Sequence, residues 1–139
     1  MVGRTKYRNK AERERIEFVK FYMGCLCCIL RRQLNSHADY HHVVKGFKRL
    51  GHICGFGLCC WHHRGEPWPG MIMVECALVY GASLAHDKKL FVKTFGDELL
   101  LVETTDFAHS LFLDNPWNEF RMPESIAEQI RSFHTDLEK

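Results

Sequence analysis

The sequence predicts a small α+β domain stabilised by bound zinc. Three observations support this fold class: helical patterns near both ends of the chain, two short β-type segments in its middle, and cysteines and histidines at metal-ligand spacings beside them. The 139 residues fit one domain with its own core. A hydrophobic content of 46% argues against disorder, and no apolar run approaches the roughly 18 residues of a membrane span.

The first half of the chain is expected to form a helix and a hairpin. Residues 9–22 begin with good helix formers and continue with apolar residues at helical spacing. A strand is predicted over residues 39–44, and the segment 52–58 is expected to return beside it after a basic, glycine-flanked turn. A helical turn should then begin at Cys59.

The second half is predicted to contain two more helices. One is expected to start at Ser83 as its cap and to end at Gly96, and a short strand is expected over residues 97–104. The last helix follows Pro123, because apolar residues recur after it at spacings of 4, 3 and 4. We therefore expect a basic N-terminal helical segment (1–22), a central zinc domain (23–104) and a C-terminal helical extension packed on that domain (105–139).

Charge is unevenly distributed along the chain. Residues 1–49 hold 12 Lys and Arg against 4 Asp and Glu, whereas residues 50–139 hold 7 against 13. A basic first third is expected to bind an anionic partner, most commonly nucleic acid. No apolar segment follows the basic start of the chain, so a secretory signal is not expected.

Seven cysteines and nine histidines point to metal binding. The odd number of cysteines argues against a disulfide framework. Cys25-x2-Cys28 and Cys59-x2-His62 lie 30 residues apart, and two such pairs are what a closed tetrahedral zinc site requires.

Other cysteines compete for these positions. Cys27 is an alternative to Cys25 or Cys28, and Cys60 is an alternative to Cys59. Cys54 and Cys76 have no partner at a ligand spacing and are expected to be apolar thiols of the core.

The histidines suggest a second ion. Adjacent residues of a strand point to opposite faces, so one member of His41-His42 can face a metal while the other faces elsewhere. If His62 completes the first site, then His63 is free to bind another ion, and His86 is the natural additional ligand.

The order of these motifs resembles that of the HNH endonuclease superfamily, whose ββα-metal unit is a hairpin followed by a helix with one catalytic ion between them. More narrowly, it is similar to the recombination-enhancement, RecA-dependent nuclease family of phages and prophages, over roughly residues 20–102. The motifs are Gly24-Cys25-x-x-Cys28, His41-His42, Leu58-Cys59-x-x-His62-His63-x-Gly65, and His86 followed by Phe91, Phe95 and Gly96.

The resemblance implies roles for individual residues. Cys25, Cys28, Cys59 and His62 would hold a structural zinc ion. His41, His63 and His86 would bind a catalytic divalent ion. This ion would be magnesium or manganese in turnover, and zinc could occupy the same site. His42 would be the general base.

Two departures from the HNH pattern stand out. His41 stands where many HNH enzymes have aspartate, which favours a softer ion. The asparagine that braces the base has no clear counterpart, and His52 is the nearest polar residue.

The implied activity is hydrolysis of DNA phosphodiester bonds, dependent on RecA and acting in phage recombination, in the cytoplasm of a bacterial host. DNA and a RecA filament would be the partners, and no membrane partner is expected. The candidate DNA contacts are Arg31, Arg32, Lys45, Lys48, Arg49 and Arg64. The alternative is a non-catalytic zinc module that binds DNA or protein, which would need only the first four ligands.

Overall fold

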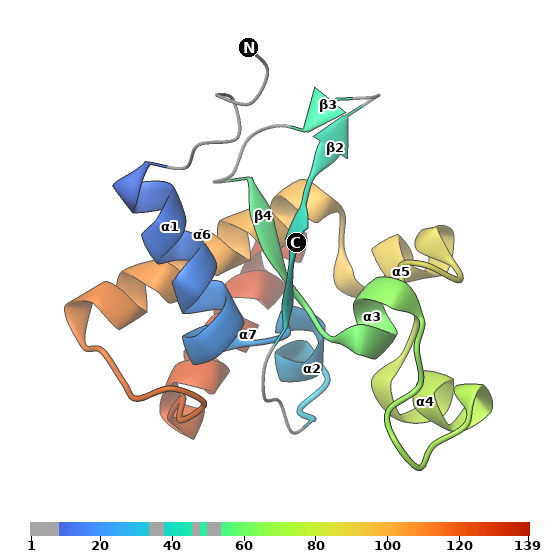
Figure 1. Cartoon of the computed structure of the whole chain (residues 1–139). Helices are drawn as coiled ribbons and strands as arrows, with labels where there is room; N and C mark the ends of the chain where they lie inside the picture. The colour runs from blue at the N-terminus through green and yellow to red at the C-terminus, as the bar shows by residue number, and fades with distance from the viewer. Residues whose placement is uncertain (1–8, 34–37, 46–47, 50–53) are drawn as a thin grey trace.

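The computed structural model describes residues 9–33, 38–45, 48–49 and 54–139, and it has an α+β architecture, as expected (Figure 1). Its elements in chain order are α1 (Lys10–Glu17), the π-helical segment η2 (Phe18–Met23), α2 (Leu26–Leu30), β1 (Asp39–His42), β2 (Val44–Lys45), β3 (Lys48–Arg49), β4 (Gly55–Leu58), α3 (Cys60–Arg64), α4 (Met73–Tyr80), α5 (Lys88–Phe95), α6 (Glu98–Asp114) and α7 (Glu124–Glu138).

The predicted hairpin is present at the centre of the molecule. β1 and β4 pair antiparallel, with His41 opposite Phe56 and His42 opposite Gly55. The pair β2–β3 continues the hairpin outward, beyond the packed helices (Figure 1). His52, the candidate replacement for the bracing asparagine, lies outside the described residues. Helix α3 follows β4 directly, so the order strand, strand, helix is observed.

The expected N-terminal helix is also present. Asn9 and Glu12 form a reciprocal capping box, in which each side chain accepts the backbone N–H of the other residue, both at 2.8 Å. The last turn widens into η2 and ends at Gly24, whose φ of 83° places it in the left-handed region. Phe18 and Val19 of this turn are buried in the core.

Two expectations for the second half are wrong. The helix expected from Ser83 begins only at Lys88, because Asp87 caps it by accepting the N–H of Leu90. Ser83 instead accepts the N–H of Ala85 in the preceding turn. Residues 97–104 do not form a strand: Asp97 caps α6 by accepting the N–H of Leu100, and the apolar residues after it lie on helical faces.

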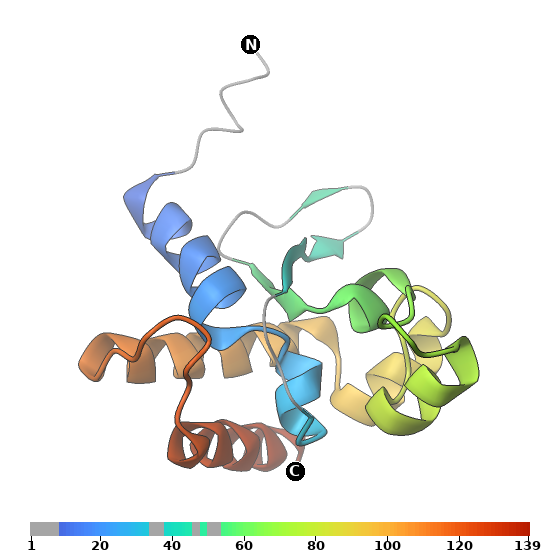
Figure 2. The same cartoon turned by 60° about the horizontal axis from the view of Figure 1, so that its bottom comes forward.

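The C-terminal helix is present and packs along α6 (Figure 2). The rings of Phe107 and Phe133 stack with their centroids 4.2 Å apart. Ile130 is fully buried between the two helices and the core. The expected divisions of the chain, after residues 22 and 104, fall inside η2 and inside α6.

Helix α4 was not expected. Ile72, Val74 and Leu78 at or near this helix are 64%, 64% and 74% exposed, and Cys76 is its buried residue. No helix among the described residues has both the length and the apolar character that crossing a membrane requires.

Candidate metal centre and active site

Four of the predicted metal ligands form one buried cluster. Cys25 and Cys59 are the N-cap residues of the short helices α2 and α3, and each sulfur accepts a backbone N–H three residues later. One helical turn then brings Cys28 beside Cys25, and His62 beside Cys59. In each case, one helical turn therefore forms both the N-cap and the pair of metal ligands.

The donor atoms of this cluster have the spacing of ligands to one ion. The sulfurs of Cys25 and Cys59 each lie 3.3 Å from Nδ1 of His62, and the sulfur of Cys28 lies 3.7 Å from it. The sulfurs of Cys28 and Cys59 are 3.8 Å apart. Tetrahedral zinc sites, with bonds of about 2.3 Å to sulfur and about 2.0 Å to nitrogen, place neighbouring donors about 3.5–3.8 Å apart. The residues present fit a structural metal ion such as zinc.

The second nitrogen of His62 is held by the backbone. Its Nε2 lies 2.7 Å from the carbonyl oxygen of Tyr80, at the end of α4. Because a carbonyl only accepts, Nε2 carries a proton, and Nδ1 is the nitrogen that faces the three sulfurs. Helix α4 thus positions a ligand of the cluster.

Contacts within the cluster shift the pKa values of three of its four members. Burial lowers the pKa of His62, but hydrogen bonds with the sulfurs of Cys25 and Cys59 outweigh it and raise this pKa to about 10. Hydrogen bonds with Cys25 and Cys28 lower the pKa of Cys59, whereas those with Cys25 and Cys59 raise the pKa of Cys28. The thiolate form of Cys59 is thus favoured, whereas Cys28 and His62 hold protons that a bound cation would displace.

The competing cysteines do not join this group. Within the described part of the chain, Cys25, Cys28, Cys59 and His62 form the one set of three or more donors that lie within 4.8 Å of one another. Cys27 is fully buried beside them, and burial raises the pKa of its thiol. Burial also raises the pKa of Cys60, which is partly exposed. The alternatives based on Cys27 and Cys60 are therefore not supported.

The structure also brings His41 of β1 and His63 of α3 together. Nδ1 of His41 lies 3.3 Å from Nε2 of His63, and the two rings meet nearly edge to face. Their side chains are 18% and 27% exposed, so this pair is open to solvent where the cysteine cluster is closed.

Two carboxylates contact the outer nitrogens of this pair. Nε2 of His41 lies 2.6 Å from Glu98 of α6, and Nδ1 of His63 lies 3.1 Å from Asp39 of β1. The hydrogen bond with His41 lowers the pKa of Glu98, against the opposing effect of burial. The sequence prediction missed both residues. Asp39 could have been found, since it lies two residues before His41 on the same strand face.

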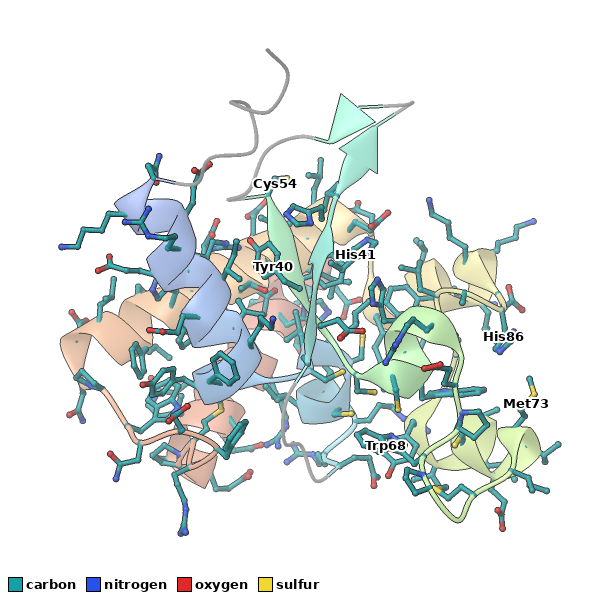
Figure 3. The ribbon with its side chains drawn as sticks, in the orientation of Figure 1. Tyr40, His41, Cys54, Trp68, Met73 and His86 are labelled. Carbon is teal, nitrogen blue, oxygen red and sulfur yellow. The ribbon has the colours of Figure 1, made fainter. Side chains whose placement is uncertain are left out.

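The structure leaves His86 and His42 apart from the pair. His86 lies in the turn before α5, and its side chain is exposed. Its Nε2 lies 2.9 Å from the carbonyl oxygen of Gly65. Figure 3 shows His86 well separated from His41. The ring of His42 meets that of Tyr40 edge to face, with centroids 5.2 Å apart. Tyr40 and His41 point to opposite sides of β1 (Figure 3), and the alternation of a strand places His42 on the side of Tyr40.

Three of the predicted DNA contacts have partners within the protein. Arg31 donates to the carbonyl oxygens of Leu78 and Val79, both at 3.2 Å, at the end of α4. Arg32 pairs with Glu128 of α7 at 2.6 Å.

Arg64 contacts Asp39 and Glu66, each at 3.3 Å. The other three predicted contacts, Lys45, Lys48 and Arg49, lie on the outer hairpin β2–β3. The structure describes the backbone of these three residues and not their side chains.

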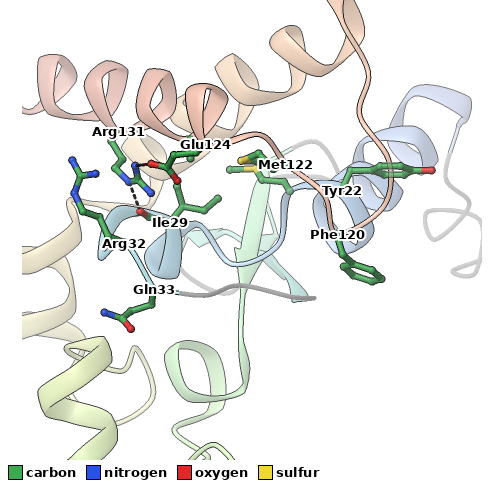
Figure 4. A pocket seen from close by; sticks show the side chains of 10 residues that line it. Tyr22, Ile29, Arg32, Gln33, Phe120, Met122, Glu124 and Arg131 are labelled. Carbon is green, nitrogen blue, oxygen red and sulfur yellow. Dashed lines mark hydrogen bonds and ion pairs between the residues drawn. The ribbon is translucent and has the colours of Figure 1, made fainter.

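A pocket of about 370 Å³ lies elsewhere, between η2, α2 and the start of α7 (Figure 4). Arg131 at its edge donates to the carbonyl oxygen of Ile29 and pairs with Glu124, each at 2.7 Å. Of the predicted site residues, Arg32 is the one that lines this pocket. The pocket is therefore separate from both histidine-containing sites.

These features define a class: an α+β protein in which a hairpin and the helix after it carry a histidine pair beside a buried Cys3His cluster. The sequence model of one family, described as "Recombination enhancement, RecA-dependent nuclease", matches residues 9–108. The match covers 100 of the 139 residues, and the chain belongs to this family. The expected resemblance to this family is thereby confirmed. Comparison with curated proteins and with solved structures found no match.

Proposed function

We propose that this protein is a metal-dependent DNA endonuclease of the HNH type, which hydrolyses phosphodiester bonds. The observation that carries the proposal is the pair His41 and His63, whose inner nitrogens lie 3.3 Å apart at the junction of the hairpin and α3. Two imidazoles that share one ion tetrahedrally have nitrogens about 3.3 Å apart. Membership of a nuclease family supports the same conclusion.

The two sites have different tasks in this proposal. Cys25, Cys28, Cys59 and His62 would hold zinc, which would join α2 to α3 and so fix the position of the hairpin between them. His41 and His63 would hold the second ion, and His86 would join them if it left the carbonyl oxygen of Gly65. A divalent ion at this second site would supply Lewis acidity, neutralising charge on the scissile phosphate and on the departing oxygen.

His42 is the proposed general base. A neutral imidazole with an ordinary pKa near 6.5 can accept a proton from water at physiological pH. Its neighbour Tyr40 is fixed by Arg15, which donates to the tyrosine hydroxyl at 3.0 Å. The ring contact between Tyr40 and His42 therefore links the base to the buried Arg15.

DNA would approach along the basic outer hairpin and the N-terminal third of the chain. Lys45, Lys48 and Arg49 would contact phosphates, together with Arg31, Arg32 and Arg64. Phosphate contacts from lysine and arginine position a duplex without selecting its sequence. The family description supports a further step, in which cleavage takes place on DNA held in a RecA filament.

The test is a cleavage assay on single-stranded, duplex and RecA-coated DNA with magnesium, manganese or zinc. We expect cleavage of RecA-coated DNA by the unmodified protein, and a loss of about 10²-fold to 10⁴-fold in His42→Ala, the usual contribution of a general base. Circular dichroism and DNA binding should not change in this variant. His109→Gln, which removes an imidazole of α6 distant in sequence from the site, is the matched control and should cleave normally.

The possible results separate the two interpretations of the sequence. Cleavage by His42→Ala at the normal rate would overturn the role of His42 as base. A protein that binds one zinc ion, binds DNA and cleaves none of the substrates would be a non-catalytic zinc module.

A further inference from the structure

The two outer nitrogens of the histidine pair each meet a carboxylate. Glu98 lies against Nε2 of His41, and Asp39 lies against Nδ1 of His63. An ionised carboxylate accepts hydrogen bonds and donates none. The nitrogen that faces it therefore carries the proton, so a neutral His41 is protonated at Nε2 and a neutral His63 at Nδ1.

The inner nitrogens are consequently both bare. Nδ1 of His41 and Nε2 of His63 then direct their lone pairs at each other across 3.3 Å. Two acceptors at this distance repel each other unless a proton or a cation lies between them. The two carboxylates thus leave one unprotonated nitrogen on each ring, and these two nitrogens are placed to bind the same cation.

Each carboxylate is itself supported by a basic residue. Lys88 of α5 lies 3.6 Å from Glu98, and Arg64 of α3 lies 3.3 Å from Asp39. The resulting chain runs from Lys88 through Glu98 to His41, and from His63 through Asp39 to Arg64. Each carboxylate therefore lies between an imidazole and a basic side chain.

We propose that Glu98 and Asp39 are positioning residues of the second metal site, which fix the tautomers and ring orientations of His41 and His63. This inference rests on the proposed function, in which that histidine pair holds an ion. Glu98 is the stronger of the two, because its side chain is 15% exposed whereas that of Asp39 is 45% exposed. Helix α6, which lies outside the hairpin and α3, thereby completes the site.

The first experiment measures zinc binding by calorimetry on the full chain loaded with one zinc ion. The unmodified protein should bind a second ion. Glu98→Ala should bind it about 10-fold to 100-fold more weakly, the usual effect of losing an outer partner of a ligating histidine. Asp39→Ala should show a smaller loss. Glu103→Gln, an exposed acidic residue of the same helix, is the matched control and should bind normally.

Retention of the first zinc ion and an unchanged circular dichroism spectrum show that each variant is folded. Glu98→Gln separates the two effects of Glu98, since its amide oxygen still accepts the hydrogen bond but carries no charge. Binding between that of Glu98→Ala and the unmodified protein is expected. Equal binding in the unmodified protein and in Glu98→Ala would overturn the inference and leave the proposed function standing.

The second experiment uses nitrogen NMR of the histidine rings in the protein that holds only the first zinc ion. His63 should be protonated at Nδ1 and His41 at Nε2, and Asp39→Ala should move the proton of His63 toward Nε2. The opposite tautomers in the unmodified protein would contradict the positioning role. Absence of any second zinc ion in the unmodified protein would overturn both this inference and the proposed metal site.

Discussion

His62 and His63 are neighbours in α3, yet they belong to sites of opposite character. His62 is fully buried and faces three sulfurs. His63 is 27% exposed and faces one other imidazole. A site with four protein donors is closed, whereas one with fewer keeps positions for water and substrate. One turn of helix therefore contributes to a closed cluster on one face and to an open histidine pair on the other.

The groups that contact the outer histidine nitrogens also differ between the two sites. The outer nitrogen of His62 meets the neutral carbonyl of Tyr80, whereas those of His41 and His63 meet ionised carboxylates. A carboxylate makes an imidazole more basic than a carbonyl does, and so strengthens it as a ligand. The closed cluster has thiolate charge of its own. The open pair has none, and we infer that it depends on the charge of Glu98 and Asp39.

The largest expected effect comes from breaking the closed cluster. Cys59→Ala removes both a ligand and the cap of α3. Structural zinc contributes on the order of 10 kcal/mol to folding, so this variant should lose its zinc and should not fold cooperatively. Zinc content after dialysis and a thermal melt followed by circular dichroism measure the result.

Cys76→Ala is the control for this variant. Cys76 is equally buried, in α4, but lies outside the cluster. Its replacement should leave the zinc content unchanged and lower stability by only about 1–2 kcal/mol, through the small cavity that it leaves. Retention of tightly bound zinc and a normal melt in Cys59→Ala would contradict the assignment of the structural site.

A substitution at the open pair should separate activity from folding. His63→Ala removes a side chain that the closed cluster does not use, so we expect its free energy of unfolding to change by less than about 1 kcal/mol. DNA cleavage should fall by about 10²-fold or more, because the proposed second ion loses one of its two inner ligands. Parallel measurements of melting, zinc content and cleavage check this.

His62→Ala is the matched comparison, one residue away in the same helix. It should lose zinc and stability together. Similar behaviour of the two variants, with both unfolded or both active, would show that the division between a closed and an open site is wrong.

Local chemistry explains which parts of the structure could be predicted. The ligand pairs Cys25/Cys28 and Cys59/His62 are each formed within one capped helical turn, so spacing alone indicates them. The hairpin and the two terminal helices likewise follow from short-range patterns and caps. Residues three or four apart thus indicated these parts correctly, whereas the caps of α5 and α6 at Asp87 and Asp97, which are equally local, were missed.

The parts that could not be predicted depend on distant contacts. Helix α4 lacks an amphipathic pattern, and its role is defined by the contact between Tyr80 and His62, 18 residues apart. Glu98 reaches His41 across 57 residues. The apolar run before Thr104 fits a strand as well as a helix, and packing against α7 decides in favour of α6.

The smallest expected effect concerns Gly65, which ends α3 beside the open pair. Its φ of +71° is left-handed, and an added Cβ would lie 2.2 Å from Nε2 of His86. The left-handed conformation costs an alanine about 1 kcal/mol relative to glycine. His86 is exposed at its ring and can move away at little cost. Gly65→Ala should therefore be destabilised by about 1 kcal/mol, as measured by denaturant unfolding, while its structural zinc is retained.

The same variant sharpens the prediction for His86 as third ligand of the second ion. The methyl group of the new alanine should displace the ring of His86. This ring then loses its contact with the carbonyl oxygen of residue 65 and is released from the end of α3. If His86 binds the second ion after such a movement, Gly65→Ala should bind that ion at least as tightly as the unmodified protein, whereas His86→Ala should bind it more weakly. Equal zinc affinity in His86→Ala and the unmodified protein would remove His86 from the site and leave His41 and His63 as its inner ligands.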